Sequence, residues 1–459
     1  MEDTGLYQME VKNEDLFWLD FYNVIQKVSK EFDEQWQVRK RLLDTNFLVF
    51  FILKLLLSKN KQGYTSILCE LWDSSQKNIS LPKETPIAAS SVCEARQKMP
   101  ETIFLELNKA ILAKGQLAKS SLNWHNHRIF AVDGCRINVP RELIDNGYKK
   151  LNKSHYPTGL ISCLYHLEEE IIYDFNFNSL LSERESLFEH IEHLSLGDVL
   201  VLDRGYFSCM LLYKCLEKKI DVVCRIQSGS INKTMQNFLD SQETDQIIQY
   251  YPSESVKYDL KRRKINLEYK VIPLRMFKYT IKDETYLFAT TLLDKKYTIN
   301  DFSKLYHARW GIEELYKISK QFIEVEDFHS KSERGVKQEI YAHLFLINIA
   351  RIFEAKAKNN LPPPKLNGNE QIKQENTYWQ SFCDECKEIK INFKNCLLVI
   401  GRYIEQLFFN CKFITDWLPN MLYSISRVRQ KIRPGRHYCR QSYKPVKKWA
   451  ISISNKKKN

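Results

Sequence analysis

The sequence predicts an α/β protein in which a mixed sheet is flanked by helical regions. Three observations support this fold class. Apolar residues recur with helical spacing from Leu16 to about Leu122. After Trp124, short apolar runs alternate with amphipathic segments, which is typical of a mixed α/β sheet. Helical spacing returns at Ile299 and continues through Ile318.

Residues 1–125 are expected to form a helical N-terminal region. Asp44 and Thr45 are a plausible cap for the apolar run 47–57, and Thr102 opens a second amphipathic run. The run 47–57 is much shorter than the roughly 20 residues of a membrane-spanning helix, so we expect it to be buried in the protein. Arg96 and Lys98 fit either a DNA contact or a solvated helix face, and the second reading is favoured.

The strands of the sheet are expected in a particular order. Runs at 128–133, 160–167 and 170–177 predict three strands. The acidic pair 168–169 separates the last two runs and indicates a hairpin turn, so we expect an antiparallel meander. A helix (183–194), a strand (198–203), a helix (208–216) and a strand (221–226) follow. This is the strand and helix order of a ribonuclease-H-like domain, which we assign to residues 126–227 and 299–358.

The segment 228–298 is more polar and predicts a β-rich insertion into that domain. Strands are expected at 249–251, 258–269 and within 279–293. The basic cluster 261–264 fits a DNA backbone contact or a solvated turn equally well. A further apolar helix is expected at 338–355, and residues 359–459 predict a helical C-terminal region with a basic tail that ends in Lys456, Lys457 and Lys458.

The charge balance indicates a polyanionic partner. The 459 residues include 69 Lys and Arg against 56 Asp and Glu, which gives a net charge of +13. Nucleic acid is the first candidate, and an anionic membrane surface is the second. Residues 1–14 contain four acidic residues and no apolar run, so we expect a cytoplasmic protein rather than a secreted one.

The 12 cysteines are scattered, which is typical of free thiols in a reducing cytosol. Cys383 and Cys386 are the one tight pair. They can be read as half of a zinc site, but no second pair has matching spacing, so incidental or buried thiols are the preferred interpretation.

Three carboxylates are candidates for a metal site. Asp133 and Asp203 end two different predicted strands, and their side chains converge if those strands are neighbours. Each alone is an ordinary turn residue. Glu313 lies on a helix four positions after Arg309 and four before Lys317, so all three share one face. Such spacing usually indicates surface ion pairs, but carboxylates are also the ligands that hard divalent cations prefer.

The helix that carries Glu313 has a further pattern. Tyr306, Arg309, Glu313 and Lys320 follow the spacing Tyr-x2-Arg-x3-Glu-x6-Lys. This pattern resembles the signature of the DDE transposases of the fourth family of bacterial insertion sequences, a group that includes cut-and-paste elements. Two companion motifs resemble those around the first and second aspartates of that family, at residues 132–134 and 201–206.

The resemblance implies a function and a set of roles. Asp133, Asp203 and Glu313 would bind Mg²⁺, with Mn²⁺ able to substitute, at a site for two ions. Tyr306, Arg309 and Lys320 would hold DNA phosphates. The implied partners are double-stranded DNA, as terminal inverted repeats and as target, with a dimer in the DNA complex and no membrane.

The same resemblance implies a bacterial, nucleoid-associated protein whose helical N-terminal region binds the element's ends. Two alternatives remain open from the residues. One is a catalytically silent DNA-binding remnant or inhibitor, which would keep DNA binding without cleavage. The other is a different metal-dependent nuclease on the same scaffold, and the spacing around Glu313 argues against it.

Overall fold

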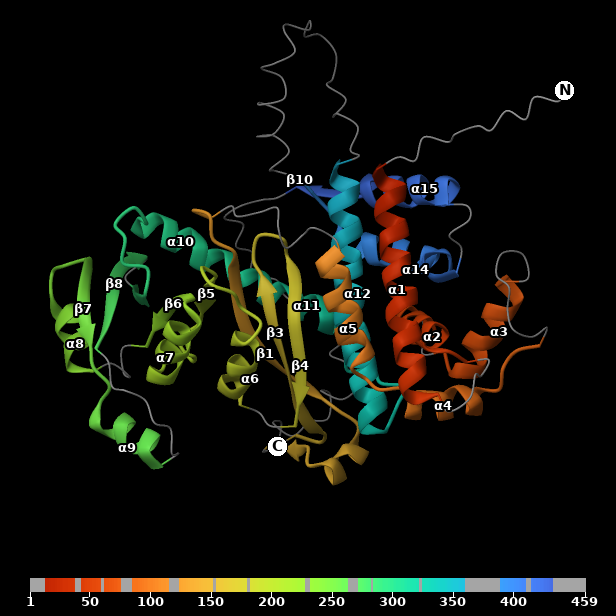
Figure 1. The fold of residues 1–459 in the computed structure, drawn as a ribbon, viewed down its shortest axis with the longest axis horizontal. Helices are drawn as coiled ribbons and strands as arrows, with labels where there is room; N and C mark the ends of the chain where they lie inside the picture. Colours follow the sequence, from red (N-terminus) through yellow and green to blue (C-terminus); the bar gives the residue numbers. More distant parts are fainter. Residues whose placement is uncertain are drawn as a thin grey trace, which may run out of the picture.

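A computed structural model describes residues 13–37, 43–58, 62–75, 85–114, 124–151, 154–179, 182–227, 232–262, 271–281, 284–321, 324–359, 389–409 and 414–431. The molecule is elongated, with a sheet at one end and a group of helices at the other (Figure 1). No helix in the ranges just given is long and apolar enough to cross a membrane.

One mixed sheet of nine strands forms the first part. From one edge, β3 lies next to β1, followed by β5, β6, β9, β8 and β7, while β2 and β4 both pair with β3. The strands are β1 (Ile129–Asn138), β2 (Lys149–Lys150), β3 (Pro157–His166), β4 (Ile171–Asn178), β5 (Val199–Leu202), β6 (Asp221–Ile226), β7 (Asp245–Tyr250), β8 (Ile272–Ile281) and β9 (Glu284–Thr290).

Strands β1, β3 and β4 form the expected antiparallel meander. Strand β5 runs parallel to β1, and β6 runs parallel to β5. These neighbours place the predicted first and fourth strands side by side, which is the arrangement that lets Asp133 and Asp203 approach each other.

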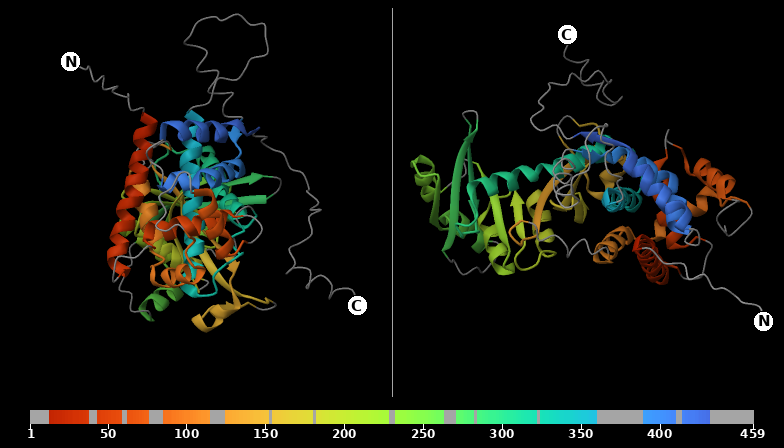
Figure 2. Two further views of the ribbon diagram at one scale, coloured as in Figure 1. Left: turned by 90° about the vertical axis from the view of Figure 1, so that its right-hand side faces the viewer. Right: turned by 90° about the horizontal axis from the view of Figure 1, so that it is seen from above.

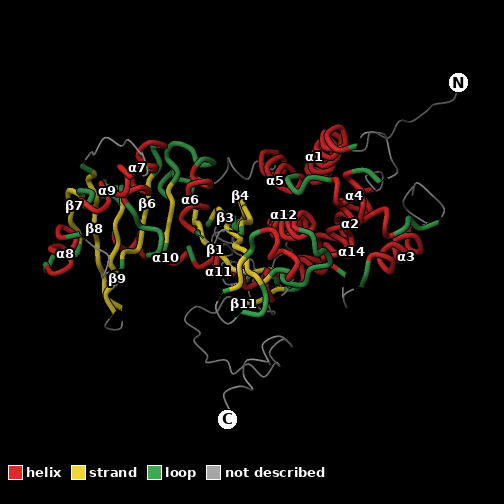
Figure 3. The backbone as a smooth tube through the Cα atoms, turned by 90° about the horizontal axis from the view of Figure 1, so that it is seen from below, coloured by secondary structure: helices red, strands yellow, loops and turns green. Residues whose placement is uncertain are grey.

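Helices cover both faces of this sheet. Along β1, Ile129 and Ala131 point into one core, whereas Phe130 and Val132 point into the other, as the period of two requires. Helices α6 (Glu183–Ile191), α7 (Cys209–Lys218) and α8 (Lys233–Asp240) pack on the second core. Helices α10 (Ile299–Ala308) and α11 (Trp310–Gln321) lie on the opposite face (Figure 3).

The helical part gathers segments from both ends of the chain around one long helix, α12 (Glu333–Asn359). Figure 2 shows the two C-terminal helices lying among the N-terminal ones. The other helices here are α1 (Asn13–Trp36), α2 (Thr45–Leu57), α3 (Tyr64–Ser75), α4 (Ala89–Lys98), α5 (Ile103–Lys114), α14 (Phe393–Phe409) and α15 (Ile414–Arg427), with a ribbon of β10 (Ile389–Ile391) and β11 (Arg429–Lys431).

Contacts between these helices explain two features of the sequence. Asp44 caps α2 by accepting a hydrogen bond from the backbone N–H of Phe47 at 2.8 Å, as predicted. Lys54 is the one charged residue in the apolar run. It is accommodated there because its Nζ lies 3.1 Å from Oε1 of Glu405 on α14. The run 47–57 is therefore a buried helix with one paired charge.

Three local expectations were wrong. The first strand does not end at Asp133, as the run 128–133 predicted, because β1 continues through Gly134 to Asn138 by pairing with β3. Residues 258–262 belong to a helix, α9 (Glu254–Arg262), rather than to a strand. Arg96 faces neither DNA nor solvent, since it is 3% exposed and pairs with Glu339 on α12 at 3.0 Å.

The strands of the segment 228–298 extend the main sheet, because β9 pairs antiparallel with β6 and β8 pairs with β9. The expected domain boundaries stay a prediction. Cys383, Cys386, residues 263 and 264 of the basic cluster, and the Lys456–Lys458 tail lie outside the described residues.

Candidate active site

Asp133 lies within β1, and Asp203 directly follows the carboxyl end of β5, the parallel neighbour of β1. The pairing of β1 with β5 runs from Ile129 opposite Val199 to Ala131 opposite Val201. Continuing this register places Asp133 level with Asp203, on strands that lie about 4.8 Å apart in a sheet. The β1–β5 ladder ends two residues before Asp133, so the sheet is open at the level of the two carboxylates.

The helices α10 and α11 carry the third acid to the same place. Thr298 and Asp301 form a capping box that begins α10, and Arg309 stands at the junction where α10 ends and α11 begins. The hydroxyl of Tyr316 on α11 donates a hydrogen bond to the backbone oxygen of Asp133 at 2.7 Å. This bond fixes α11, and with it Glu313, against β1.

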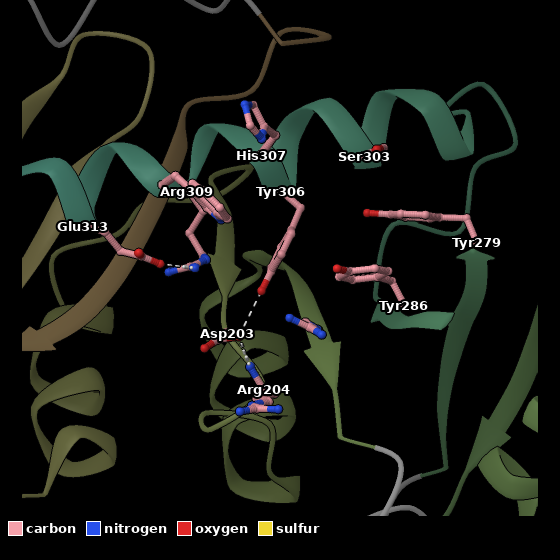
Figure 4. Close-up of a pocket in the computed structure, with 11 residues that line it drawn as sticks. Asp203, Arg204, Tyr279, Tyr286, Ser303, Tyr306, His307, Arg309 and Glu313 are labelled. Carbon is pink, nitrogen blue, oxygen red and sulfur yellow. Dashed lines mark hydrogen bonds and ion pairs between the residues drawn. The ribbon is translucent and has the colours of Figure 1, made fainter. Parts of the chain in front are cut away.

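Two polar contacts join the predicted residues (Figure 4). The hydroxyl of Tyr306 donates a hydrogen bond to Oδ1 of Asp203 at 2.9 Å. Nη2 of Arg309 lies 2.7 Å from Oε1 of Glu313. Arg309 is only 4% exposed, so its guanidinium is held inside the protein.

These residues line an open pocket of about 510 Å³. Figure 4 shows the pocket between α10 and α11 on one side and the ends of the strands on the other. Tyr279 and Tyr286 form its far wall with stacked rings 5.6 Å apart, and Arg225 lies over the Tyr286 ring. The lining residues are Asp203, Arg204, Arg225, Tyr279, Tyr286, Ser303, Tyr306, His307, Arg309, Trp310 and Glu313.

The two aspartates differ in their electrostatic surroundings. Burial raises the pKa of Asp133 to about 6, and the negative charges of Glu183 and Glu313 add to this, against the Gly134 N–H bond and the charge of Arg309. Burial also opposes ionisation of Asp203. Its pKa is nevertheless lowered, because Arg204 N–H and the Tyr306 hydroxyl donate hydrogen bonds to it. Burial and the Asp203 charge raise the pKa of Tyr306 to about 12.

Four of the six predicted site residues, Asp203, Tyr306, Arg309 and Glu313, therefore line this pocket. Asp133 lies beside it on β1 and is not among the lining residues, and Lys320 makes a separate contact. Nζ of Lys320 donates a hydrogen bond to the backbone oxygen of Arg136 at 2.8 Å. This bond holds the last turn of α11 against β1, beyond Asp133 in the strand direction. Lys320 is not among the residues that line the pocket.

The chemistry of the donors fits a hard divalent cation. Asp133 and Asp203 lie level with each other where the β1–β5 ladder ends, and the charges of Glu183 and Glu313 act on Asp133 in a way that a cation would offset. Two buried polar atoms here, the Tyr206 hydroxyl and Nε of Arg309, have no hydrogen-bond partner among the described residues. Within those residues, no three His, Cys, Asp or Glu side chains are grouped closely enough to hold a metal ion in their present positions.

Several residues of this site were not anticipated from the sequence. Arg225 is the one basic residue of β6 and lies between the apolar residues Cys224 and Ile226, and that contrast was an available signal. Trp310 is 54% exposed, which is unusual for a large aromatic ring in a helix. Tyr279 and Tyr286 carried no signal beyond strand propensity, because their stacking depends on the pairing of β8 with β9.

Comparison with known proteins places this site within a matched region. Residues 124–349 match the family described as the transposase DDE domain, and all six predicted site residues lie inside the match. A search of curated proteins finds no match to the chain. Among solved structures, the chain is similar to the piggyBac transposase in a synaptic complex with hairpin DNA. The identity is 12%, the match covers 93% of this chain and 88% of that one, and the TM-score is 0.40, which is too distant to bear on function.

Proposed function

We propose that this chain, in which residues 124–349 match the transposase DDE domain, is a DNA transposase that cleaves at transposon ends and joins them to target DNA. The observation that carries the proposal is the register of β1 and β5. It sets Asp133 level with Asp203, while Tyr316 anchors the Glu313 helix to the Asp133 backbone.

In this proposal Asp133, Asp203 and Glu313 hold Mg²⁺ or Mn²⁺ as a pair of ions. Such ions activate the attacking oxygen and stabilise the leaving oxygen of a phosphodiester. The protein's own residues orient that site. Tyr306 holds Asp203 through its hydroxyl, and Arg309 holds Glu313 through its guanidinium, so each acid has a fixed direction.

The pocket beside the carboxylates supports DNA as the substrate. Arg204 and Arg225 line it together with the buried Arg309, which gives a cationic wall for phosphates. The stacked rings of Tyr279 and Tyr286 offer flat apolar surfaces suited to bases. The DNA strand being cut would then run along this pocket toward Asp203.

The finer assignments belong to the same proposal. They are the fourth insertion-sequence family with its Tyr-Arg-Glu-Lys signature, a ribonuclease-H-like core with a β-rich insertion, end recognition by the N-terminal helices, a dimer on DNA, and a bacterial nucleoid location. The strand order β4-β3-β1-β5-β6 supports the core assignment. Lys320 contacts DNA in this scheme only after it leaves the Arg136 carbonyl.

Replacing Glu313 tests the proposal. The substrate is DNA that carries the ends of the chain's own element, with cleavage measured in Mg²⁺. We expect Glu313→Gln to lower cleavage by at least about 1000-fold, an electrostatic loss of the order known for groups that stabilise charge in a transition state. Binding of the same DNA, measured by gel shift, should change little.

The neighbouring Glu314 provides a matched control, because it is exposed and undergoes the same loss of charge. Glu314→Gln should cleave like the unaltered protein. Full activity of Glu313→Gln, or equal loss in both variants, would refute the assigned role of Glu313.

A further inference from the structure

A fourth carboxylate, that of Glu183, lies against the candidate active site. Glu183 is the first residue of α6 and follows Ser182, which caps that helix. A Cβ placed on Gly134 would be 2.7 Å from Cγ and 3.1 Å from the carboxyl carbon of Glu183. Only glycine at this position allows so close an approach, and Gly134 directly follows Asp133. The Glu183 carboxyl group is therefore packed against the backbone beside the first aspartate.

Helix α6 is held in place by contacts at both of its ends. Nε of Arg184 donates a hydrogen bond to the backbone oxygen of Gly205 at 2.8 Å, which ties the helix to the turn that follows Asp203. Near the other end, the imidazole of His190 is hydrogen-bonded to Asp174 at 2.7 Å and to Ser162 at 3.1 Å. Glu183 thus sits on a rigid element, as a ligand group should.

Two groups at this point lack partners. The Glu183 carboxylate forms no hydrogen bond or ion pair with any residue in the described ranges. The Tyr206 hydroxyl also has no hydrogen-bond partner among them, although Tyr206 is only 3% exposed. A buried hydroxyl without a partner costs free energy, so it indicates an additional ligand or ordered water.

The electrostatic field around Tyr206 locates that hydroxyl. Burial raises the pKa of Tyr206, and the negative charges of Asp133, Glu183 and Asp203 raise it further. The charges of these three carboxylates, from β1, α6 and the segment after β5, therefore act on the hydroxyl, and the charge of Arg309 opposes them. Because the β1–β5 ladder stops before Asp133, side chains from both faces of the sheet reach this space.

We propose that Glu183 is a fourth carboxylate of the divalent-metal site, acting beside Asp133, and that the Tyr206 hydroxyl bonds to the groups that surround the metal. The proposal rests on the function proposed above. Its competitor is a purely structural role, in which Glu183 stabilises the N-terminus of α6 as an acidic residue in the first turn.

Metal affinity of the full-length protein separates the two roles. Mn²⁺ binding to the metal-free protein, measured by isothermal titration calorimetry without DNA, should weaken on the order of tenfold or more in Glu183→Gln, as for other groups around a metal site. Tyr206→Phe should weaken it less, because it removes one hydroxyl and no charge. Glu185→Gln is the matched control, since Glu185 is exposed in the same first turn of α6.

Stability without metal gives a second measurement. In EDTA, Glu183→Gln should unfold at a urea concentration equal to or above that of the unaltered protein, because it removes repulsion with Asp133. A lower midpoint in Glu183→Gln and Glu185→Gln alike, with unchanged Mn²⁺ affinity, would show the structural role and overturn the proposal.

The outcomes also separate this inference from the proposed function. If Asp133→Asn lowers Mn²⁺ affinity but Glu183→Gln leaves it unchanged, the fourth carboxylate is refuted and the three-carboxylate site stands. If the unaltered protein binds no Mn²⁺ at all, both the inference and the metal site of the proposed function are refuted.

Discussion

At the residue scale, the cationic groups predicted to contact DNA are engaged within the protein. Arg309 is buried and paired with Glu313, and Lys320 bonds to the Arg136 carbonyl. The sequence had suggested cations displayed on one helix face. Arg309 is buried and Glu313 is partly exposed, so a phosphate that binds Arg309 competes with Glu313 for the guanidinium unless a cation takes the place of Arg309 beside Glu313. Binding of a phosphate by Arg309 is therefore expected to be coupled to metal binding beside Glu313.

His343, one of the buried histidines, gives a residue-scale prediction on the pH dependence of stability. Burial lowers the pKa of His343 to about 4, helped by His329 and opposed by Glu339. Its pKa in the unfolded chain is about 6.5, so the unfolded state binds more protons between pH 4 and 6.5. The stability that His343 contributes is complete above about pH 6.5 and is lost as the pH falls toward 4.

The measurement is urea unfolding of the metal-free protein at pH 7 and pH 5. Lowering the pH should cost the unaltered protein about 2 kcal/mol more than His343→Gln, from 1.5 pH units at about 1.4 kcal/mol each. The raised pKa of Asp133 changes the free energy of unfolding with pH in the opposite direction. Asp133 is present in both proteins, so its effect cancels in the comparison. His155 is exposed, so His155→Gln should keep the full pH dependence. An identical pH dependence in His343→Gln would contradict the assignment.

The candidate site was predictable where its residues form a local pattern. Asp133 and Asp203 each follow an apolar run, and the residues from Tyr306 to Glu313 have fixed spacing on a helix. Glu183 and Tyr206 carry no such pattern. Glu183 reaches Gly134 only after α6 packs on the sheet, and the Tyr206 hydroxyl is notable only for a partner that it lacks. Properties that arise from packing between distant segments leave little trace in local spacing.

At the element scale, α12 joins the helical part of the molecule to the sheet. It packs against α2, α4, α5, α14 and α15, and also against β4. Arg96 of α4 is central to one of these contacts, because it donates hydrogen bonds to Gln338 at 3.1 Å and to Glu339 at 3.0 Å. Both acceptors lie on α12 and are fully buried.

Replacing Arg96 should therefore lower the free energy of unfolding, and this is a test of its packing role rather than of a DNA contact. Arg96→Ala leaves the carboxylate of Glu339 buried with weaker compensation, so we expect a loss of about 3–5 kcal/mol in the free energy of unfolding. Lys98→Ala, two positions along α4 and exposed, should change it by less than about 0.5 kcal/mol. If Arg96→Ala keeps normal stability but binds DNA more weakly, the DNA contact considered from the sequence would be restored.

Element types followed from periodicity more reliably than element ends did. The strand β6 has its predicted bounds, and the cap at Asp44 is present. The errors at the end of β1 and at 258–262 have separate physical causes. Gly134 stays in a strand because β3 supplies a partner, whereas the segment 258–262 continues a helix that begins at Glu254.

At the scale of the whole molecule, the sheet continues across the segment expected to be a separate insertion. The pairing of β9 with β6 joins β7, β8 and β9 to the strands that carry Asp133 and Asp203. This continuity brings Tyr279 and Tyr286 to the wall of the pocket. Antiparallel pairing between strands so distant in sequence depends on register, which the sequence does not specify locally.

The most direct test of the central claim is cleavage of DNA that carries the flanking ends of the chain's own element, with product ends mapped at nucleotide resolution. We predict defined cuts at those ends in Mg²⁺ or Mn²⁺ and none in EDTA, with the freed 3′ hydroxyl ends joined to target DNA. Protein that shifts end-containing DNA in a gel, yet never nicks it with either metal, would contradict an active transposase and identify a silent DNA-binding protein.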